Sequence, residues 1–267
     1  MVSGEPMGKL SGVVLLLSAT VLMVSCKRDA VPPCPLTGAF QGKICKEFHY
    51  QSDTYVGMIQ WEWDQDMVLK KTFYTDKEQP YSYSLFRGDA SGYLRTESTF
   101  QESSQARMVF RQWEEDSLHR LIRFWEQKGG TSLFKEFNYD AQGRIERIEW
   151  DINAGETMYY DILHYDSNDS LYKWLRYDSG DDTFLGIWRK SYFPDQVRID
   201  CYDAQNIFTG YELFRYDGEK LKNRFVYDAD GKILEDEAFT YYPTGLLEKI
   251  ILKKQREPDH TTEYSYF

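Results

Sequence analysis

Short runs of alternating apolar and polar residues fill most of the chain, and acidic or glycine-containing turns separate them. Phe137-Asn138-Tyr139 precedes Asp140-Ala141-Gln142-Gly143, and the alternating run 144–150 follows. A period of two in short segments indicates half-buried β-strands. The turn signals come too often to leave room for long helices. The best helical stretch, 117–127, also fits a strand that ends in Phe124 and Trp125, and the spacing of the turns favours the strand.

One turn occurs four times, and its spacing is regular. The starts of the four copies are 51, 63 and 25 residues apart, which is four, five and two times a unit of about 12.6 residues. One strand plus one turn has this length. The spacing therefore predicts an all-β fold, a long antiparallel β-meander of tandem hairpins with roughly fifteen strands, curved or coiled because long sheets twist. The copies are Asp89-Ala90-Ser91-Gly92, Asp140-Ala141-Gln142-Gly143, Asp203-Ala204-Gln205-Asn206 and Asp228-Ala229-Asp230-Gly231.

The residue choices in this turn have a conformational explanation. An Asp at the first position accepts hydrogen bonds from backbone amides further on and closes a type I turn. The fourth position then needs a left-handed backbone, which Gly adopts freely and Asn adopts better than most residues. Gly92, Gly143 and Gly231 occupy this position, and Asn206 replaces Gly in the remaining copy.

Two of these segments resemble a known repeat. Tyr139-Asp140-Ala141-Gln142-Gly143-Arg144-Ile145 is similar to the YD-repeat consensus Tyr-Asp-x-x-Gly-Arg-Leu, and the segment 227–233 is nearly as close. YD repeats occur in Rhs-type and teneurin-type proteins, and the resemblance implies a twisted or spiral antiparallel sheet. Short YD-like lipoproteins of Bacteroidetes-type bacteria are similar too. The good matches cover about residues 130–245, and no toxin tip is recognisable.

The first 25 residues resemble a bacterial lipoprotein signal peptide. Lys9 precedes a mostly apolar region, 10–24, which is too short for a comfortable membrane span. Leu22-Met23-Val24-Ser25-Cys26 resembles a lipobox, although Met23 holds the place that usually contains Leu. The resemblance implies cleavage before Cys26, acylation (palmitate) of that cysteine and an outer-membrane location, on the periplasmic or the surface face. An ordinary secretory signal with an incidental Cys26 is the alternative.

The expected organisation is a signal peptide at 1–25, a flexible proline-containing tether at 26–40 and a β-hairpin repeat domain at 41–267. Cys34 and Cys45 close a short loop and form a possible disulfide in an exported protein. Cys201 lies in a strand pattern and is expected to be a packed thiol. The cysteines lack paired close spacing and the four histidines are scattered, so we expect no metal site.

Charge and composition limit the partners. The net charge of −11 argues against nucleic acid, because an acidic body repels phosphate backbones. It also disfavours broad contact with anionic lipid, so the expected membrane partner is reached through the N-terminal acyl chains. Aromatic residues make up 16% of the chain, and Tyr suits a strand face that is partly covered and partly wet.

Three acidic or histidine-containing patterns could carry chemistry, and each has a simpler interpretation. The segment 228–237 matches much of an EF-hand loop, but Val226 stands where the first oxygen ligand is needed. The acidic loop 178–182 is expected to be a solvated turn. His164 and Asp166 share a strand face, which is more typical of a polar sheet than of acid–base catalysis. No nucleophile elbow, phosphate-binding loop or dinucleotide fingerprint is present, so we expect neither an enzyme nor a cofactor.

The sequence therefore predicts a lipid-anchored cell-envelope protein that acts as a non-catalytic binding or structural surface. Exposed aromatic rows could stack on a glycan or pack against an envelope protein. An alternative is an exported carbohydrate-active enzyme with paired carboxylates on the concave face of the sheet. The tryptophans are the binding candidates, although most are expected to fill the sheet's concave face: Trp61, Trp63, Trp113, Trp125, Trp150, Trp174 and Trp188.

Overall fold

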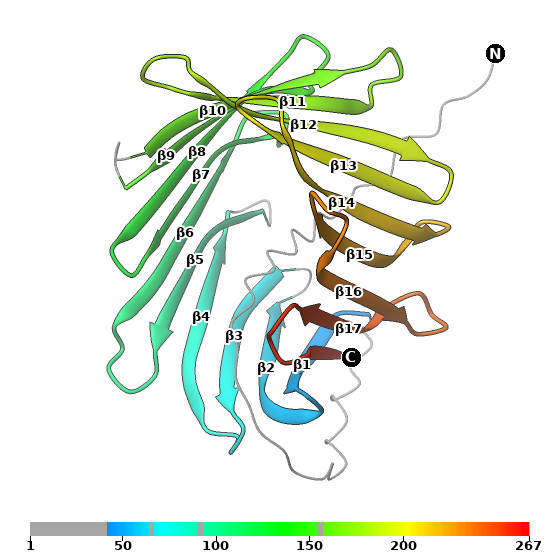
Figure 1. Cartoon of the computed structure of the whole chain (residues 1–267). Helices are drawn as coiled ribbons and strands as arrows, with labels where there is room; N and C mark the ends of the chain where they lie inside the picture. Colours follow the sequence, from blue (N-terminus) through cyan, green and yellow to red (C-terminus); the bar gives the residue numbers. More distant parts are fainter. Residues whose placement is uncertain (1–41, 65–66, 90–92, 154–156, 267) are drawn as a thin grey trace, which may run out of the picture.

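The computed structural model describes residues 42–64, 67–89, 93–153 and 157–266, and within them every regular element is an antiparallel β-strand (Figure 1). No helix in this part of the chain is long and apolar enough to cross a bilayer. The strands are β1 (Ile44–Gln51), β2 (Thr54–Asp64), β3 (Met67–Thr75), β4 (Pro80–Gly88), β5 (Leu94–Gln101), β6 (Arg107–Glu115), β7 (Leu121–Lys128), β8 (Thr131–Tyr139), β9 (Ile145–Ile152), β10 (Thr157–Tyr165), β11 (Leu171–Asp178), β12 (Phe184–Phe193), β13 (Gln196–Asp203), β14 (Phe208–Asp217), β15 (Lys220–Asp228), β16 (Ile233–Tyr241), β17 (Leu247–Lys254) and β18 (His260–Tyr266).

The strands form one sheet that closes on itself. Each strand pairs with the next in chain order, and β1 pairs with β18 through Glu47↔Tyr264 and His49↔Thr262. The antiparallel meander is therefore confirmed. The sheet has eighteen strands rather than about fifteen, and it is a closed barrel rather than an open spiral. Closure leaves no sheet edge with unpaired backbone groups.

The expected strand in the stretch 117–127 is present as β7. Phe124 and Trp125 lie inside this strand, which continues to Lys128, rather than at its end. The first part of the stretch is the turn between β6 and β7. The repeat spacing thus decided correctly between helix and strand but shifted the end of the strand.

Turns alternate between the two ends of the barrel. We call the end with the turns after even-numbered strands the even rim, and the opposite end the odd rim. Residues 42 and 266 both lie at the even rim, because β1 starts where β18 ends. Asp89 and Asp140 follow β4 and β8 at the even rim, whereas Asp203 and Asp228 are the last residues of β13 and β15 at the odd rim. Five units, an odd number, separate the second copy from the third, so the change of rim follows from the spacing.

The turn at Asp140 shows the local geometry of the repeat. The Gly143 amide donates to the Asp140 carbonyl at 2.9 Å, and Asp140 Oδ1 accepts from the amides of Gln142 and Arg144, both at 2.9 Å. Gly143 has φ +81°. The copies at Asp203 and Asp228 have the same bonds, with positive φ at Asn206 and Gly231. Asp89 accepts from the Tyr93 amide at 3.1 Å, while Gly92 lies outside the described residues.

Two further turns of this type carry no Gly or Asn at the fourth position. Asp116 and Asp166 each accept two amides with Oδ1, and the fourth residues, His119 and Asp169, both have φ +60°. His and Asp are among the residues that tolerate this region. The sequence pattern missed both turns because it relied on the fourth residue, whereas the Asp at the first position is the shared feature.

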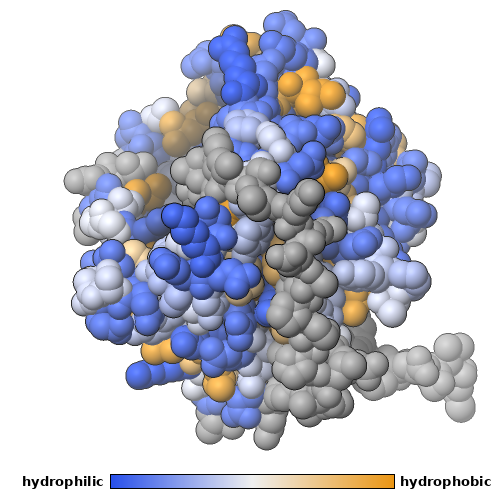
Figure 2. Space-filling model, turned by 90° about the horizontal axis from the view of Figure 1, so that it is seen from below, coloured by the Kyte–Doolittle hydropathy of each residue, from blue (hydrophilic) through white to orange (hydrophobic). Residues whose placement is uncertain are grey.

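The two faces of the barrel wall differ in exposure. Residues directly opposite each other on neighbouring strands share a face, so the pairing assigns every strand position to one side. One face carries enclosed ion pairs such as Arg111–Glu97, with side chains 13% and 8% exposed, and this is the inward face. The other carries pairs such as Arg123–Glu114, 48% and 44% exposed, and this is the outward face. The view in Figure 2 is mostly hydrophilic, with hydrophobic residues in small scattered groups.

Candidate binding site

At the even rim, a turn joins each even-numbered strand to the next odd-numbered strand. The other neighbouring strands, such as β7 and β8, separate from each other before they end. Between β7 and β8 the ladder stops at Arg123↔Glu136, although β8 continues to Tyr139. The Tyr139 hydroxyl crosses this gap and donates to the Leu121 carbonyl at 2.7 Å. We call such a bond a rim staple. It satisfies a carbonyl that the ladder leaves unpaired.

Rim staples recur around the even rim. Five tyrosines and one tryptophan donate to the carbonyl at or next to the start of the preceding strand, at distances of 2.7–3.0 Å. Each closes the gap between its own strand and the strand before it. The donors and acceptors are Trp63 and Ile44, Tyr139 and Leu121, Tyr165 and Ile145, Tyr192 and Leu171, Tyr241 and Leu221, and Tyr266 and Leu247.

The Arg of the repeat connects one turn to the next staple. Arg144 Nε donates to Asp140 Oδ2 at 2.7 Å, and its guanidinium carbon lies 4.7 Å from the centre of the Tyr165 ring. Arg120 has the same position relative to Asp116 and Tyr139. Each residue of the consensus therefore has a physical role. Tyr forms the staple and Asp closes the turn, while Gly adopts the left-handed backbone and Arg places its cation over the next tyrosine.

Three gaps of the even rim lack a staple. Between β13 and β14 the ladder continues to Gln196↔Arg215, so little gap remains. Between β3 and β4 the staple position is Gly88, and Met67 fills the space: a Cβ on this glycine would lie 2.4 Å from Met67 Sδ. Between β5 and β6 the staple position is Glu115, and the ladder stops at Thr96↔Gln112.

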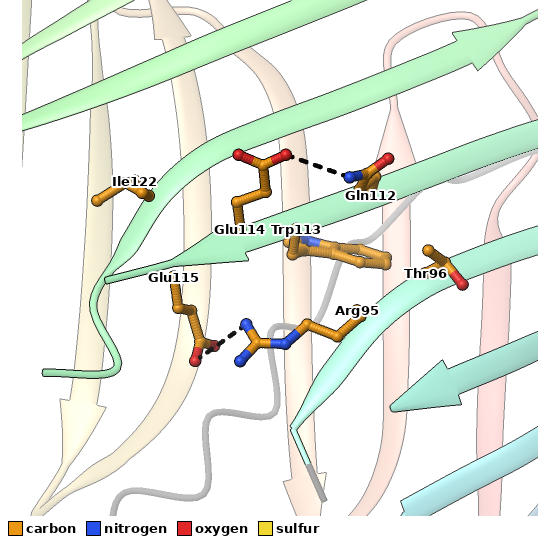
Figure 3. Close-up of a pocket in the computed structure, with 7 residues that line it drawn as sticks. All are labelled: Arg95, Thr96, Gln112, Trp113, Glu114, Glu115 and Ile122. Carbon is orange, nitrogen blue, oxygen red and sulfur yellow. Dashed lines mark hydrogen bonds and ion pairs between the residues drawn. The ribbon is translucent and has the colours of Figure 1, made fainter. Parts of the chain in front are cut away.

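The gap between β5 and β6 contains a shallow pocket of about 450 Å³ (Figure 3). Figure 3 shows Trp113 between the two strands, and Arg95 reaching from β5 toward Glu115 at the end of β6. Gln112 and Glu114 lie along β6 on the other side of Trp113. The lining residues are Arg95, Thr96, Gln112, Trp113, Glu114, Glu115 and Ile122.

Negative charge exceeds positive charge around this pocket. Arg95 Nη2 lies 2.5 Å from Asp89 Oδ2, and its Nη1 lies 3.3 Å from Glu115 Oε2. These carboxylates and its hydrogen bonds to them raise the pKa of Arg95, against the effect of burial. Glu115 Oε2 is enclosed, and its nearest polar neighbours are Arg95 Nη1 at 3.3 Å and His119 Nδ1 at 3.5 Å. Gln112 Nε2 donates to Glu114 Oε1 at 3.2 Å.

The inward face of the barrel carries carboxylates that are tied to arginines. Arg111 binds Glu97 and Glu126, at 2.9 and 2.5 Å, and Arg176 binds Asp161 at 2.8 Å. Arg224 binds three carboxylates at 2.9–3.3 Å, those of Glu212, Glu235 and Glu237. These arrangements hold the carboxylates as structural partners.

A second group on the inward face lies beside the seam between β1 and β18. Burial raises the pKa of Glu47 to about 7, and it lowers the pKa of His49 to about 4. His49 Nε2 lies 3.7 Å from Glu47 Oε2. Lys71 Nζ lies 4.0 Å from the centre of the Trp61 ring, and burial lowers its pKa. Trp61 Nε1 is enclosed and makes no well-aligned hydrogen bond within the described residues, although its contact with Glu47 partly offsets the rise in the pKa of that carboxyl.

The tryptophans of the sequence analysis divide between the two faces. The strand pairing places five of them on the inward face, where Lys135 lies 3.8 Å from the centre of the Trp150 ring and two others stack with centroids 5.6 Å apart. Trp63 is a rim staple, and Trp125 lies on the outward face against Phe110. The inward five are Trp61, Trp113, Trp150, Trp174 and Trp188.

The other chemical candidates lie in separate places. Asp166 closes a turn, whereas His164 lies on the outward face with its ring 6.4 Å from Tyr172. Asp228 closes its turn with Oδ1, and no group of three metal-ligating side chains occurs among the described residues. In the acidic loop, Asp178 and Asp181 accept backbone amides.

Two cysteines lie in the described ranges. Cys45 is disulfide-bonded and 3% exposed, and its partner lies outside these ranges, so pairing with Cys34 stays a prediction. Cys201 is a free thiol whose pKa burial raises to about 11. Cys26, the signal peptide and the tether also lie outside the described residues.

No family model matches the sequence, and no curated protein matches it. Solved structures resemble it in outline. A porin-like protein from Bacteroides uniformis matches with a TM-score of 0.45 and 9% identity over 85% of this chain and 98% of that one. A porin-like protein from Bacteroides vulgatus matches with a TM-score of 0.31 and 9% identity over 84% and 98% of the two chains. The Photorhabdus luminescens Tc holotoxin pore matches at 0.20 and 10% identity, over 77% of this chain but only 16% of that one. TM-scores this low support no inference about function.

Proposed function

We propose that this chain is a lipid-anchored protein of the bacterial cell envelope, whose barrel serves as a non-catalytic binding or structural surface. The observation that carries the proposal is the charge on the outward face. Glu149, in the middle of β9, is outward and 49% exposed, and Arg123 and Arg147 are outward nearer the even rim, 48% and 40% exposed. Charged side chains on a lipid-facing wall destabilise it, most strongly toward the bilayer midplane. The wall therefore stands in water, and the N-terminal lipobox supplies the membrane attachment.

The inward carboxylates support a non-catalytic role. A glycosidase needs two carboxyl groups that can act as acid and as base or nucleophile. Glu97 and Glu126 instead share the guanidinium of Arg111, and Asp161 is held by Arg176. The repeat geometry and the arginine pairs together favour binding over hydrolysis.

Fractionation of cells tests the anchor. We expect the wild-type protein in the membrane fraction, labelled by palmitate, and Cys26→Ala in the soluble or unprocessed fraction without label. Two saturated acyl chains hold a protein on a bilayer durably, whereas the unmodified chain relies on weak contacts. Cys201→Ala is the matched control and is expected to stay on the membrane. Membrane retention and labelling of Cys26→Ala would contradict the proposal.

A further inference from the structure

The gap between β5 and β6 is left unbridged because of one residue in the repeat. The residue before the turn Asp is Tyr139 in one copy and Tyr165 in the next, and both bridge their gaps. Before Asp116 the residue is Glu115, whose side chain is shorter and binds Arg95 instead. The strands separate beyond Thr96↔Gln112, as they do at the stapled gaps, but here no aromatic side chain bridges them, and this is where the pocket lies (Figure 3).

The pocket offers an apolar surface next to groups that form hydrogen bonds. Trp113 supplies the apolar surface, and its ring is tilted against Phe124 with centroids 5.8 Å apart. Arg95 and Glu115, which lie beyond the last ladder pair, supply the polar groups, and Glu115 Oε2 is enclosed with Arg95 Nη1 at 3.3 Å. A volume of about 450 Å³ lies within the range of small-molecule sites.

The electrostatics select an uncharged ligand. Arg95, the cation among the lining residues, is shared between Asp89 and Glu115. Glu114 adds a further carboxylate, and the chain carries a net charge of −11. An anionic ligand would meet more negative than positive charge, and a cation would compete with Arg95 for both carboxylates.

We infer that this gap binds one or two rings of a neutral saccharide, with a sugar ring against Trp113 and its hydroxyl groups on Arg95 and Glu115. A sugar ring has C–H faces that pack on an aromatic ring and hydroxyl groups that both donate and accept. The inference deepens the proposed binding role by assigning a site and a ligand class, and it rests on that role being one of binding.

Saturation-transfer NMR on the purified full chain tests the site. A cooperative melt checks that each preparation is folded. The probes are glucose, galactose, N-acetylglucosamine and the disaccharides cellobiose, lactose and chitobiose. We expect saturation transfer to at least one of them in the wild type, with the sugar ring protons showing the largest effect.

Three variants locate the binding. Trp113→Ala removes the apolar surface, and we expect affinity to fall at least tenfold. Glu115→Tyr restores the consensus residue, whose hydroxyl is placed to reach the Leu94 carbonyl, and we expect it to close the gap and abolish binding without loss of thermal stability. Trp125→Ala, on the outward face, is the matched control and is expected to bind as the wild type does.

Absence of transfer to every probe would overturn the inference, and so would equal affinity in all variants. If Trp113→Ala fails to fold, Glu115→Tyr decides the question, because it adds a side chain that the fold already uses at the equivalent positions. A negative result here leaves the anchoring proposal standing, since the Cys26 experiment does not involve this gap.

Discussion

Single side chains on the inward face link the stability of the barrel to pH. Glu47 has a pKa raised to about 7 by burial, so the folded protein retains a proton that the unfolded chain releases near pH 4.5. The stability that this proton provides is complete below pH 4.5 and is lost as the pH rises to about 7. His49 has the opposite shift, to about 4, so its contribution is complete above pH 6.5 and is lost as the pH falls toward 4.

The two effects oppose each other between pH 4.5 and 6.5. We expect His49→Gln to gain stability relative to the wild type as the pH falls across this window, and Glu47→Gln to lose it. One unmatched proton changes the free energy of unfolding by about 1.4 kcal/mol per pH unit, and partial exposure makes the observed slope smaller. Urea denaturation midpoints of the wild type and the two variants, taken at steps of half a pH unit, measure this slope. Parallel curves for all three would contradict the assignment of these shifts.

The structural roles of the repeat residues could be predicted from the sequence only in part. The Asp that closes the turn and the Gly or Asn in left-handed backbone follow from local chemistry, because both act within five residues. The turns at Asp116 and Asp166 were missed because His119 and Asp169 adopt the left-handed region that Gly usually fills. The role of Tyr139 could not be predicted, since its acceptor, Leu121, is 18 residues away.

At the even rim, where the backbone hydrogen bonds between two strands have ended, the rim staples stabilise the contact between those strands. Tyr139→Phe keeps the ring and its contact with Arg120, but it removes the hydroxyl that satisfies the Leu121 carbonyl. A lost hydrogen bond that leaves a partly buried acceptor costs about 1–3 kcal/mol. We therefore expect a loss of about 1–2 kcal/mol in the free energy of unfolding, measured by urea denaturation.

The matched control for this variant is Tyr202→Phe. Its ring packs against Phe208, but within the described part of the chain its hydroxyl donates no hydrogen bond that the structure records. We expect a change within about 0.5 kcal/mol. Equal destabilisation by the two substitutions would mean that the staple hydroxyl adds nothing beyond the general effect of removing a tyrosine hydroxyl.

The gap between β5 and β6 shows why a candidate site was hard to find from the sequence. The seven tryptophans were all candidates, and nothing in the sequence separated Trp113 from the rest. The distinguishing signal is the residue before Asp116, which is Glu115 where the repeat has Tyr. That signal has meaning only after the structure shows that this tyrosine bridges two strands.

For the whole barrel, the sequence predicts the antiparallel meander but not its closure. Hairpin turns describe contacts between neighbours in the chain, and β1 and β18 are more than 200 residues apart. Their pairing is encoded by ordinary strand residues, such as Thr262 opposite His49, which carry no turn signal. The number of strands was underestimated because the degenerate turns, including Thr75 to Glu78, lack the Asp at the first position and the Gly at the fourth that the pattern required.

The closed barrel depends on the pairing of β1 with β18, because the enclosed inward face exists only if the sheet closes. Cross-strand amide NOEs in a deuterated sample measure this pairing directly. We expect contacts between Glu47 or His49 on β1 and Thr262 or Tyr264 on β18, with slow amide exchange on both strands. Rapid exchange along the facing edges of β1 and β18, without NOEs between them, would show an open sheet and would contradict the closed barrel.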